Sequence, residues 1–573
     1  MRVLLVMPTP FENGRLGLEN VVWLSEPVAL TSVGTAAAED GHEVRVLDLR
    51  LEDEDALVRT LASWKPDVVG TTSMTTDAYQ AKAVLRTARS VCPRALTVVG
   101  GHHPTLCPDE FDFDYVDVVV QGEGEQTFRE ILSRWSAQKA TDDRTFDGVK
   151  GTRWREPAGV RRVNAKREQT TSLDDLPVPD RRLIEKYKGR YFFTAFRPMA
   201  SIFTSRGCSF DCNFCAIWEF YERRTRFLSA KKIVDQMEAC DEPFVFVLDD
   251  NFLTNKRRVV ELCEEMERRG LKKFWMTQGR TDFAADNPEL IARLAKNGLV
   301  MLLSGFESND DDNLAALRKK SSWEKNLRAN DVLRKNGVVS TGIFMVRPDW
   351  TKEQFEQLYE YVNSLDIGIP LFTILTPLPG TQLHRAYQDK LLTTDHRLFD
   401  LLHAVLPTRL PREEFYAEFC RAYDATEKSV RNAYKWFFKA RPTFIPKNLR
   451  GIVWFYARTW RYQRIHGDHR SFLRDEEGLL NGPGAKAGIT WQDVTYPKGD
   501  EHAEVEQPAP GGKLLKLRIP RRTWVDDVAE RSGATRRNIG GLGGAPPEEV
   551  DVAERSGATR SESTAAVSAG VGE

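Results

Sequence analysis

Short apolar segments alternate with amphipathic segments twice along this chain, and this alternation constrains the fold more than any other feature. In the first series the apolar segments are 2–8, 43–50, 67–73, 95–101 and 117–124. The amphipathic segments between them are expected to be helices at 27–40, 52–64, 77–91 and 125–137. Strands and helices in this order indicate a parallel sheet covered on both faces. We therefore predict an α/β, doubly wound, Rossmann-like domain over residues 1–137.

A second series of six strand candidates begins near residue 196. The candidates are 200–208, 244–250, 274–280, 300–307, 340–346 and 371–379. Helical segments near 229–241, 255–270, 286–297, 310–318, 323–336 and 352–365 separate them. Six such units favour a partial (β/α)6, TIM-like barrel at 196–392 over a second open sheet, and barrels carry their active residues at the carboxyl ends of the strands. Residues 138–195 are predicted to be a linker with a small hairpin.

The remainder of the chain divides into a helical region at 393–480 and a tail at 481–573. Between Val430 and Ile465 there are nine Lys and Arg residues, ten aromatic residues and no acidic residue. That stretch suits a helical cap over the barrel, which we favour, or contact with a membrane surface. The tail, which contains VAERSGATR at 528–536 and again at 552–560, is predicted to be mostly disordered.

Charge and hydropathy exclude several classes of protein. The 573 residues include 82 Lys and Arg against 83 Asp and Glu, so the net charge of −1 argues against a general nucleic-acid-binding protein. The chain has no apolar run of about 18 residues that would span a membrane. Its opening, MRVLLVMPTP, is too short an apolar run for a secretory signal. We expect a cytoplasmic protein.

Three of the eight cysteines fall within eight residues, in the loop after the first predicted barrel strand. Cys208, Cys212 and Cys215 follow the pattern C-x3-C-x-aromatic-C. Three thiolates can hold a [4Fe–4S] cluster by three of its irons and leave the fourth iron open. A structural zinc site would need a fourth Cys or His nearby, and none follows locally. Zinc and a chance grouping are the alternatives, and the other five cysteines are expected to be packing residues.

This cysteine pattern at a barrel strand end resembles the radical S-adenosylmethionine (SAM) superfamily. The resemblance implies that SAM chelates the open iron and is cleaved by one electron to a 5′-deoxyadenosyl radical. It also implies SAM contacts at the aromatic residue before the third cysteine and at successive strand ends. The second strand end departs from the commoner Gly-Gly-Glu. The implied residues are Phe214, Asp249, Asp250, Gln278, Arg280, Ser304 and Glu307.

An open sheet directly before such a barrel resembles the cobalamin-binding class of that superfamily, over roughly residues 1–470. A dinucleotide-binding domain would instead need G-x-G-x-x-G after the first strand, and PTPFENG does not supply it. The cobalt-ligating pattern Asp-x-His-x-x-Gly is also incomplete, because Arg45 stands where Gly is required after His42. We expect no protein histidine on cobalt. The cobalamin contacts implied are Thr72, Ser73, Thr75, Gly100, Gly101, His102, His103, Gly122, Glu123 and Gly124.

The two modules together imply a C-methyltransferase that uses a [4Fe–4S] cluster, SAM and methylcobalamin to methylate an unactivated carbon of a lipid or natural product. Residues 391–411 most resemble the hopanoid C-3 methylase group. A small-molecule or lipid substrate and a flavodoxin-like or ferredoxin-like electron donor are the implied partners. Peripheral membrane contact would suit a lipid substrate, and no nucleic acid is expected. The alternatives are a cyclase or rearrangement enzyme of the same class, and a non-catalytic cobalamin or iron–sulfur sensor.

Overall fold

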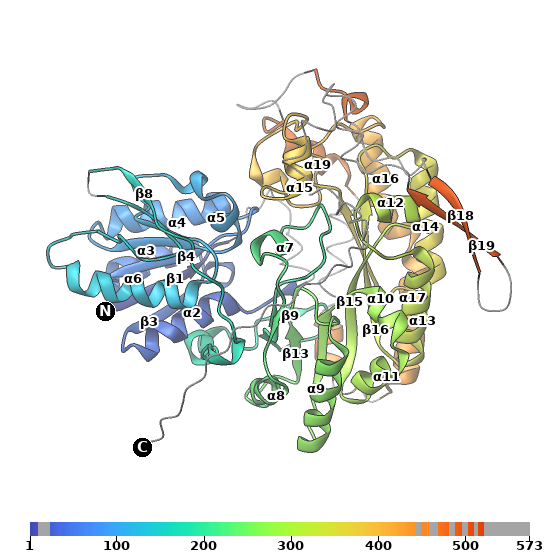
Figure 1. Ribbon diagram of the computed structural model, residues 1–573, viewed down its shortest axis with the longest axis horizontal. Coiled ribbons are helices and arrows are strands. Elements are labelled where there is room, and N and C mark those ends of the chain that lie inside the picture. The colour runs from blue at the N-terminus through green and yellow to red at the C-terminus, as the bar shows by residue number, and fades with distance from the viewer. Residues whose placement is uncertain are drawn as a thin grey trace, which may run out of the picture. The chain divides into compact units, whose positions relative to one another are not determined.

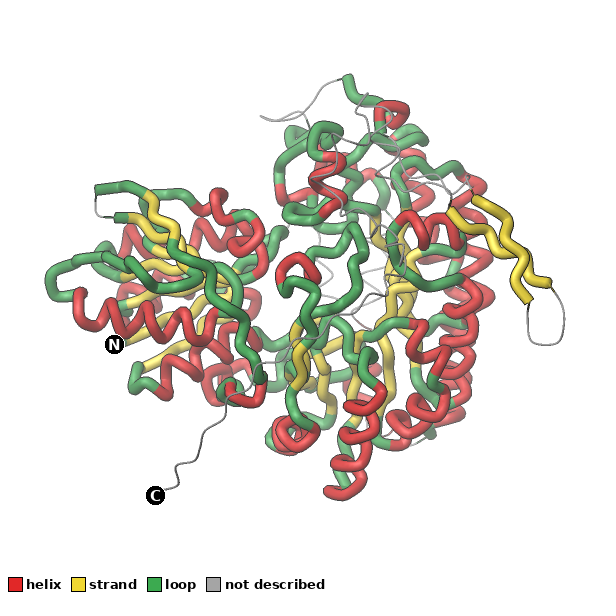
Figure 2. The backbone as a smooth tube through the Cα atoms, viewed as in Figure 1, coloured by secondary structure: helices red, strands yellow, loops and turns green. Residues whose placement is uncertain are grey.

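The computed structural model describes residues 1–9, 23–156, 158–442, 444, 446, 448–454, 457, 468–480 and 488–494, with the backbone of 502–508 and 514–520. Met1–Arg521 form one compact unit, which holds two large sheets and the helices around them (Figure 1). Strands and helices alternate around each sheet (Figure 2). Within the described residues, no helix is long and apolar enough to span a bilayer.

The first sheet has the strand order β3-β1-β4-β5-β6-β7-β8, and its first five strands are parallel. Because β3 and β4 lie on opposite sides of β1, the strand order reverses beside β1, and ligands of such sheets bind at the carboxyl ends near this point. The hairpin predicted within 138–195 forms as β7 and β8 and continues this sheet in antiparallel fashion. The strands are Arg2–Met7 (β1), Glu43–Asp48 (β3), Val68–Thr72 (β4), Leu96–Gly100 (β5), Val118–Val120 (β6), Thr152–Arg155 (β7) and Arg161–Val163 (β8).

Helices cover both faces of this sheet, because its strands carry buried apolar side chains on both faces. Val3 and Leu5 pack in one core with residues of α2 and α6, whereas Leu4 and Val6 pack in another with residues of α3 and α4. Successive strand residues point to opposite faces, so one strand supplies both cores. The predicted doubly wound α/β fold is confirmed. The helices are Val28–Glu39 (α2), Ala56–Trp64 (α3), Ala78–Val91 (α4), His102–Leu106 (α5) and Gly124–Gln138 (α6), with single turns at Leu49–Leu51 (η1) and Pro108–Phe111 (η2).

The second sheet contains six parallel strands in chain order, which confirms the predicted partial (β/α)6 barrel. In the described sheet the first and last strands do not pair with each other, so the barrel stays open along one side. Its strands are Met199–Ile202 (β10), Phe244–Val247 (β13), Phe274–Gln278 (β14), Leu299–Glu307 (β15), Val339–Val346 (β16) and Ile369–Ile374 (β17). Its helices are Ala230–Glu238 (α8), Lys256–Arg269 (α9), Thr281–Asp286 (α10), Pro288–Lys296 (α11), Asp311–Ala316 (α12), Trp323–Lys335 (α13) and Lys352–Leu365 (α14).

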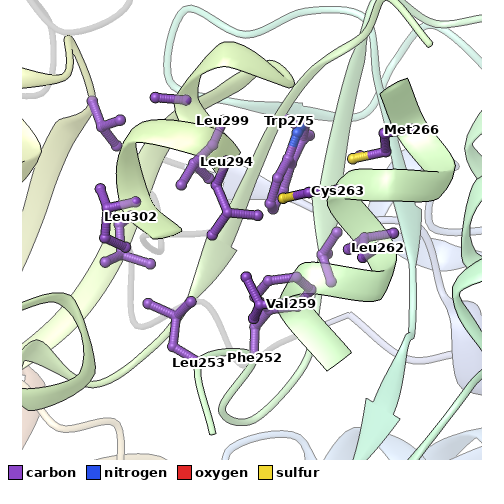
Figure 3. Close-up of a cluster of buried hydrophobic side chains, with 14 of the residues drawn as sticks. Phe252, Leu253, Val259, Leu262, Cys263, Met266, Trp275, Leu294, Leu299 and Leu302 are labelled. Carbon is purple, nitrogen blue, oxygen red and sulfur yellow. The ribbon is translucent and has the colours of Figure 1, made fainter. Parts of the chain in front are cut away.

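The core between these strands and helices contains two of the isolated cysteines, Cys240 and Cys263. Cys263 of α9 lies among apolar side chains that include Trp275 of β14 and Leu294 of α11 (Figure 3). Cys240 and Cys420 are also buried, so these three behave as the small packing residues that were predicted. Cys92 and Cys107 are half-buried.

Helices after the barrel cover the end of the sheet where its strands begin. Phe437 and Phe444 are buried against Phe244, the first residue of β13, so the described part of the basic aromatic stretch forms the predicted cap. The tail predicted to be disordered contains an antiparallel pair, β18 and β19, and its repeated nonapeptide lies outside the described residues. These elements are Gln382–Tyr387 (α15), Arg412–Ala425 (α16), Glu427–Ala440 (α17), Arg470–Glu476 (α19), His396–Leu398 (η5), Trp491–Asp493 (η6), His502–Pro508 (β18) and Leu514–Pro520 (β19).

Short elements connect the two sheets. Trp23–Leu24 (β2) pairs with Phe192–Phe193 (β9) in antiparallel fashion, which joins a strand of the N-terminal region to the segment that enters the barrel. Single helical turns precede that segment, at Leu173–Asp175 (η3) and Arg181–Tyr187 (η4).

Candidate functional site

The three clustered cysteines lie on one loop that leaves and returns through a two-stranded ribbon. Ser205–Arg206 (β11) pairs with Arg226–Phe227 (β12), and residues 207–225 form the loop between them. Gly207 opens this loop with a φ of 89°, and a Cβ there would overlap the carbonyl oxygen of Arg224. Only glycine combines this backbone conformation with such close approach. The ribbon therefore closes tightly at its end, and Cys208 follows at once.

The environment of the three thiols suits ligands of a metal cluster. Burial raises the pKa of Cys215 to about 12, and the neighbouring thiols Cys212 and Cys208 add to that effect. Burial also raises the pKa of Cys212, whereas the cations Lys319 and Arg280 lower it. A bound metal holds such thiols as thiolates, and nearby cations offset the negative charge. Three thiols on one loop fit a [4Fe–4S] cluster with one open iron.

Asp249, predicted to contact SAM, is fully buried and holds the strand that leads into the cluster loop. Its Oδ1 accepts hydrogen bonds from the backbone N–H groups of Thr204 and Ser205, at 2.6 and 2.8 Å. Its Oδ2 accepts from the hydroxyls of the same two residues, and the guanidinium of Arg258 lies 3.3 Å away. Both oxygens are occupied, so this geometry gives the predicted SAM contact no support.

Asp250, the next residue, is the better placed of the two carboxylates. It is exposed to solvent, and its Oδ2 accepts a 3.1 Å hydrogen bond from the backbone N–H of Gly207, beside Cys208. Because many protein atoms surround this accessible carboxylate, desolvation raises the pKa of Asp250 to about 6, and the charge of the adjacent Asp249 adds to this effect. A protonated amino group beside Asp250 would stabilise its ionised form, which is consistent with the predicted contact with SAM.

Arg280, Ser304 and Glu307 lie at the carboxyl ends of β14 and β15, as predicted, but each already has protein partners. Arg280 donates to Asp282 at 2.8 Å and to the carbonyl of Lys319 at 2.6 Å. Ser304 donates to the carbonyl of Gly279 at 2.7 Å. The predicted SAM contacts of these residues therefore compete with internal hydrogen bonds.

Lys319, which the sequence reasoning missed, forms a buried ion pair with Glu307. It follows α12 in an ordinary-looking RKKSS run, so no motif in the sequence marks it. By contrast, Gln278 makes no side-chain hydrogen bond within the described part of the chain, and Phe214 is half-buried beside Cys215. These two predicted SAM residues are free to contact a ligand.

The predicted cobalamin loops meet at the carboxyl ends of β4, β5 and β6. Gly101 has a φ of 107°, and a Cβ there would lie 2.5 Å from the hydroxyl of Thr72 and 2.9 Å from the backbone N of Ser73. The third loop is tied to the second, because the N–H of Gly122 donates to Thr105 at 3.0 Å. The remaining members, Thr75, Gly100 and Gly124, lie in the same loops or at the start of α6.

His102 and His103 have different environments. The ring of His102 stacks on Phe220 of the cluster loop at 5.0 Å, and its Nε2 is buried without a hydrogen-bond partner in the described chain. His103 is buried, and its Nδ1 lies 3.2 Å from the hydroxyl of Thr75. Its Nε2 lies 3.2 Å from Glu110.

His103, Glu110 and His396 bring three metal-type ligand atoms together, yet their geometry is that of a hydrogen-bonded group. His396 Nδ1 lies 3.1 Å from the same Glu110 oxygen that His103 contacts, and the ammonium of Lys82 lies 3.6 Å from it. Burial opposes ionisation, but hydrogen bonds from the two histidines hold the pKa of Glu110 well below its ordinary value. The ammonium occupies the place where a cation would otherwise balance Glu110, so we assign no metal here. The group ties the second cobalamin loop to the segment after α15.

Comparisons with known proteins agree with this geometry. Residues 14–132 match the B12 binding domain and residues 202–362 match the Radical SAM superfamily. The chain is 31% identical over 484 residues to the hopanoid C-3 methylase of Methylococcus capsulatus, covering 82% of this chain and 90% of that protein. The chain belongs to the cobalamin-dependent radical SAM family. It is therefore an enzyme of the methyltransferase branch, with cobalamin, SAM and a [4Fe–4S] cluster as its cofactors.

One further relative is named for a different reaction, and two solved structures share the fold. The anaerobic magnesium-protoporphyrin IX monomethyl ester cyclase of Rubrivivax gelatinosus is 28% identical, over 72% of this chain and 75% of that one. The solved structure of the cobalamin-dependent radical enzyme OxsB covers 84% of this chain and 76% of its own, with a TM-score of 0.60 and 15% identity. The methyltransferase TsrM from Kitasatospora setae has a TM-score of 0.53 at 19% identity, over 67% of this chain and 78% of its own.

The residues present fit the cofactors of the family. Cys208, Cys212 and Cys215 would be the donors for three irons. In the predicted cobalamin loops, Gly122 has a φ of 83° and nothing within 4 Å of where a Cβ would lie, which leaves its backbone accessible to a large ligand. The buried Nε2 of His102 is covered by protein.

Proposed function

We propose that this protein is a C-methyltransferase that adds a methyl group to an unactivated carbon of a polycyclic lipid of the hopanoid type or a related natural product. The observation that carries the proposal is the extent of the match to the hopanoid C-3 methylase, which spans 90% of that protein. The match includes both cofactor modules and the segment 391–411, so it concerns the whole reaction and not one cofactor alone.

Apolar side chains beside the cysteine loop support an apolar substrate. Phe214 precedes Cys215, and it packs with Met345 of β16 and Leu378 after β17 on a hydrophobic cluster. These positions are at the carboxyl ends of the strands, where barrel enzymes bind their substrates. Half-buried apolar groups there exclude water from a reactive centre and favour a hydrocarbon skeleton over a charged one.

In this scheme the cluster with SAM supplies one-electron chemistry and cobalamin supplies a transferable methyl group. Cys208, Cys212 and Cys215 hold the cluster. Lys319 and Arg280 offset negative charge near Cys212. Asp250 is placed to receive the amino group of SAM next to Gly207. An external flavodoxin-like or ferredoxin-like donor completes the proposal, because the chemistry requires an electron that the chain does not itself supply.

A second proposal concerns how a lipid would reach the enzyme. Leu449 and Val453 are 55% and 60% exposed, and they lie four residues apart in a helical segment that also carries Arg450. Residues with this spacing share one face of a helix. Apolar and basic groups together favour a membrane surface. Reduced co-sedimentation of a Leu449→Glu/Val453→Glu variant with anionic lipid vesicles is the expected result.

Product mass tests the proposed methylation. Anaerobic incubation with SAM, methylcobalamin, a reductant and candidate hopanoids is expected to give a product heavier by one CH2, labelled when the methyl group of SAM is labelled. A Cys208→Ala variant serves as the control without a cluster. A product of unchanged or lower mass would support the cyclase or rearrangement alternative, which the magnesium-protoporphyrin cyclase relative keeps open. The sensor alternative is disfavoured, because the relatives reported above are enzymes.

A further inference from the structure

Two arginines lie opposite each other at the base of the cysteine loop. Arg206 pairs with Arg226 across the β11–β12 ribbon, so the loop that carries Cys208, Cys212 and Cys215 leaves and returns between these two cations. Like charges directly opposite on a ribbon are destabilising unless other charges balance them. The balance here comes from the first sheet and not from the barrel.

Two glutamates of the third predicted cobalamin loop balance the two arginines. Glu123 accepts from Arg206 at 2.9 Å and from Arg226 at 2.8 and 2.9 Å. Glu125 is buried and accepts from both terminal nitrogens of Arg206. The hydroxyl of Ser32 in α2 donates to Glu125 at 2.7 Å, which fixes this carboxylate from the other side.

The contacts leave Glu123 with no free oxygen for a cofactor. Besides the two arginines, the backbone N–H of Thr170 donates to its Oε2 at 2.9 Å. Burial alone would raise the pKa of Glu123, but Arg226 and Arg206 lower it, so the carboxylate is ionised. The predicted cobalamin contact of Glu123 is therefore replaced by contacts with the ribbon.

This group of side chains lies on a short covalent and hydrogen-bonded path between the two cofactor modules. On one side, Arg206 is two residues before Cys208. On the other side, the N–H of Gly122 donates a hydrogen bond to the hydroxyl of Thr105, which belongs to the loop of His102 and His103. A shift at the glutamates would thus move both cobalamin loops relative to the cluster. Methyl and radical chemistry depend steeply on such distances, because a misplacement of about 1 Å can cost roughly a hundredfold in rate.

We propose that Arg206, Arg226, Glu123 and Glu125 form a charge clamp that sets the position of the cobalamin loops relative to the iron–sulfur cluster, with Glu123 as its central positioning residue. The clamp extends the family assignment and does not depend on which substrate is methylated. The clamp holds the two loops in register. Neutralising one glutamate would leave the facing arginines without their counter-charge in a largely buried place, and the loops would then separate or shift.

Two substrate-free reactions separate the clamp from general folding. Reductive cleavage of SAM to 5′-deoxyadenosine needs only the barrel, whereas methyl transfer from SAM to reduced cobalamin needs both modules in register. A Glu123→Gln variant is expected to keep its iron and cobalamin contents and its SAM cleavage. Its methyl transfer to cobalamin is expected to fall by about ten- to a hundredfold. The magnetic interaction between cob(II)alamin and the reduced cluster, measured by electron paramagnetic resonance, is expected to weaken.

A matched control and a rescue complete the test. Glu242, which precedes β13 of the barrel, forms an ion pair with Arg181 of η4 at 2.8 Å, outside the cysteine loop. Glu242→Gln is expected to change neither the ratio of methyl transfer to SAM cleavage nor the electron paramagnetic resonance spectrum. The exchange Glu123→Arg/Arg226→Glu is expected to restore the interaction in part. If Glu123→Gln loses its cofactors, Glu123→Asp replaces it, because it keeps the charge and only shortens the reach.

Three results would overturn the proposal. The first is an unchanged magnetic interaction and an unchanged ratio of the two reactions in the fully loaded Glu123 variant. The second is the same loss in Glu242→Gln. The third is a parallel fall of both reactions in a variant that retains its cofactors. None of these results bears on the proposed methylation of a lipid, which fails only on product mass.

Discussion

The ammonium of Lys319 lies 2.7 Å from the carboxylate of Glu307 in the interior of the barrel. Burial alone would lower the pKa of Lys319, but the charge of Glu307 raises it above its ordinary value. Gly305 makes room for the pair, since a Cβ there would overlap the carboxylate of Glu307. Glu307 itself has a φ of 59°, so the end of β15 is shaped around this contact.

Replacing one member of this pair should destabilise the protein strongly. Glu307→Gln leaves a buried ammonium without its counter-ion, and we expect a loss of about 3–5 kcal/mol in the free energy of unfolding. The double variant Glu307→Gln/Lys319→Met should recover part of that loss, because it removes the unpaired charge. Urea unfolding of the apoprotein measures both. Equal stabilities of the single and double variants would contradict the pairing.

Two glycines with positive φ angles predict different outcomes on substitution. Gly101→Ala would push a methyl group against Thr72 and Ser73 in the predicted cobalamin loops, and we expect a loss of about 1–3 kcal/mol together with weaker retention of cobalamin. Gly41→Ala, the matched control outside the predicted cobalamin loops, has a φ of 82° and meets nothing within 4 Å, so it should cost only about 1 kcal/mol of backbone strain. Corrin absorbance per protein and the melting temperature distinguish them. Equal effects would show that close approach at Gly101 is unimportant.

His102 predicts a specific dependence of stability on pH. Burial lowers the pKa of His102 from 6.5 to about 4, so the folded protein holds this ring neutral at pH values where the unfolded chain protonates it. Its contribution to stability is complete above pH 6.5 and is lost as the pH falls from 6.5 toward 4. A His102→Phe variant retains the stacking on Phe220 and removes the titration. The difference in the free energy of unfolding between the variant and the wild type should therefore shift in favour of the variant only below pH 6.5. Parallel profiles of this free energy against pH would refute the prediction.

The cysteines should separate into two classes. Cys208→Ala, Cys212→Ala and Cys215→Ala are each expected to abolish iron–sulfur absorbance after anaerobic reconstitution and to stop SAM cleavage. Cys263→Ala, at a buried position in the barrel core, is expected to keep both and to lose about 1 kcal/mol of stability through the small cavity. Iron analysis and 5′-deoxyadenosine formation provide the measurements. A Cys212→Ala variant with a full cluster would overturn the ligand assignment.

Much of the fold could be predicted because its signals are local. The segment 43–50 alternates and ends near a turn, and the structure has β3 at Glu43–Asp48. The spacing of Cys208, Cys212 and Cys215 likewise needs no tertiary information, since neighbouring residues on one loop are close in any fold. The predicted hairpin at 138–195 was right as an element, but its place at the edge of the first sheet depends on pairing with β6, which no local pattern reveals.

The site residues show where local reasoning stops. Asp249 and Asp250 are adjacent and chemically identical, yet the first is occupied by the backbone of the neighbouring strand and the second faces solvent beside Gly207. Adjacent side chains point in opposite directions at a strand end, and the sequence does not say which direction faces the ligand. Lys319 gave no signal because its partner, Glu307, lies across a helix and a turn.

The sequence by itself determined the spacing of the thiols and the order of strands and helices, which are properties of short segments, and these carried the resemblance that implied the cofactors. Only the tertiary structure decided how the two modules are held together. Glu123 lies in a loop of the first sheet. Arg226 lies at the end of the cysteine loop, 103 residues later in the chain. An ion pair across that separation exists only after both sheets have formed and docked, since a carboxylate and a guanidinium attract measurably only over a few ångströms in water.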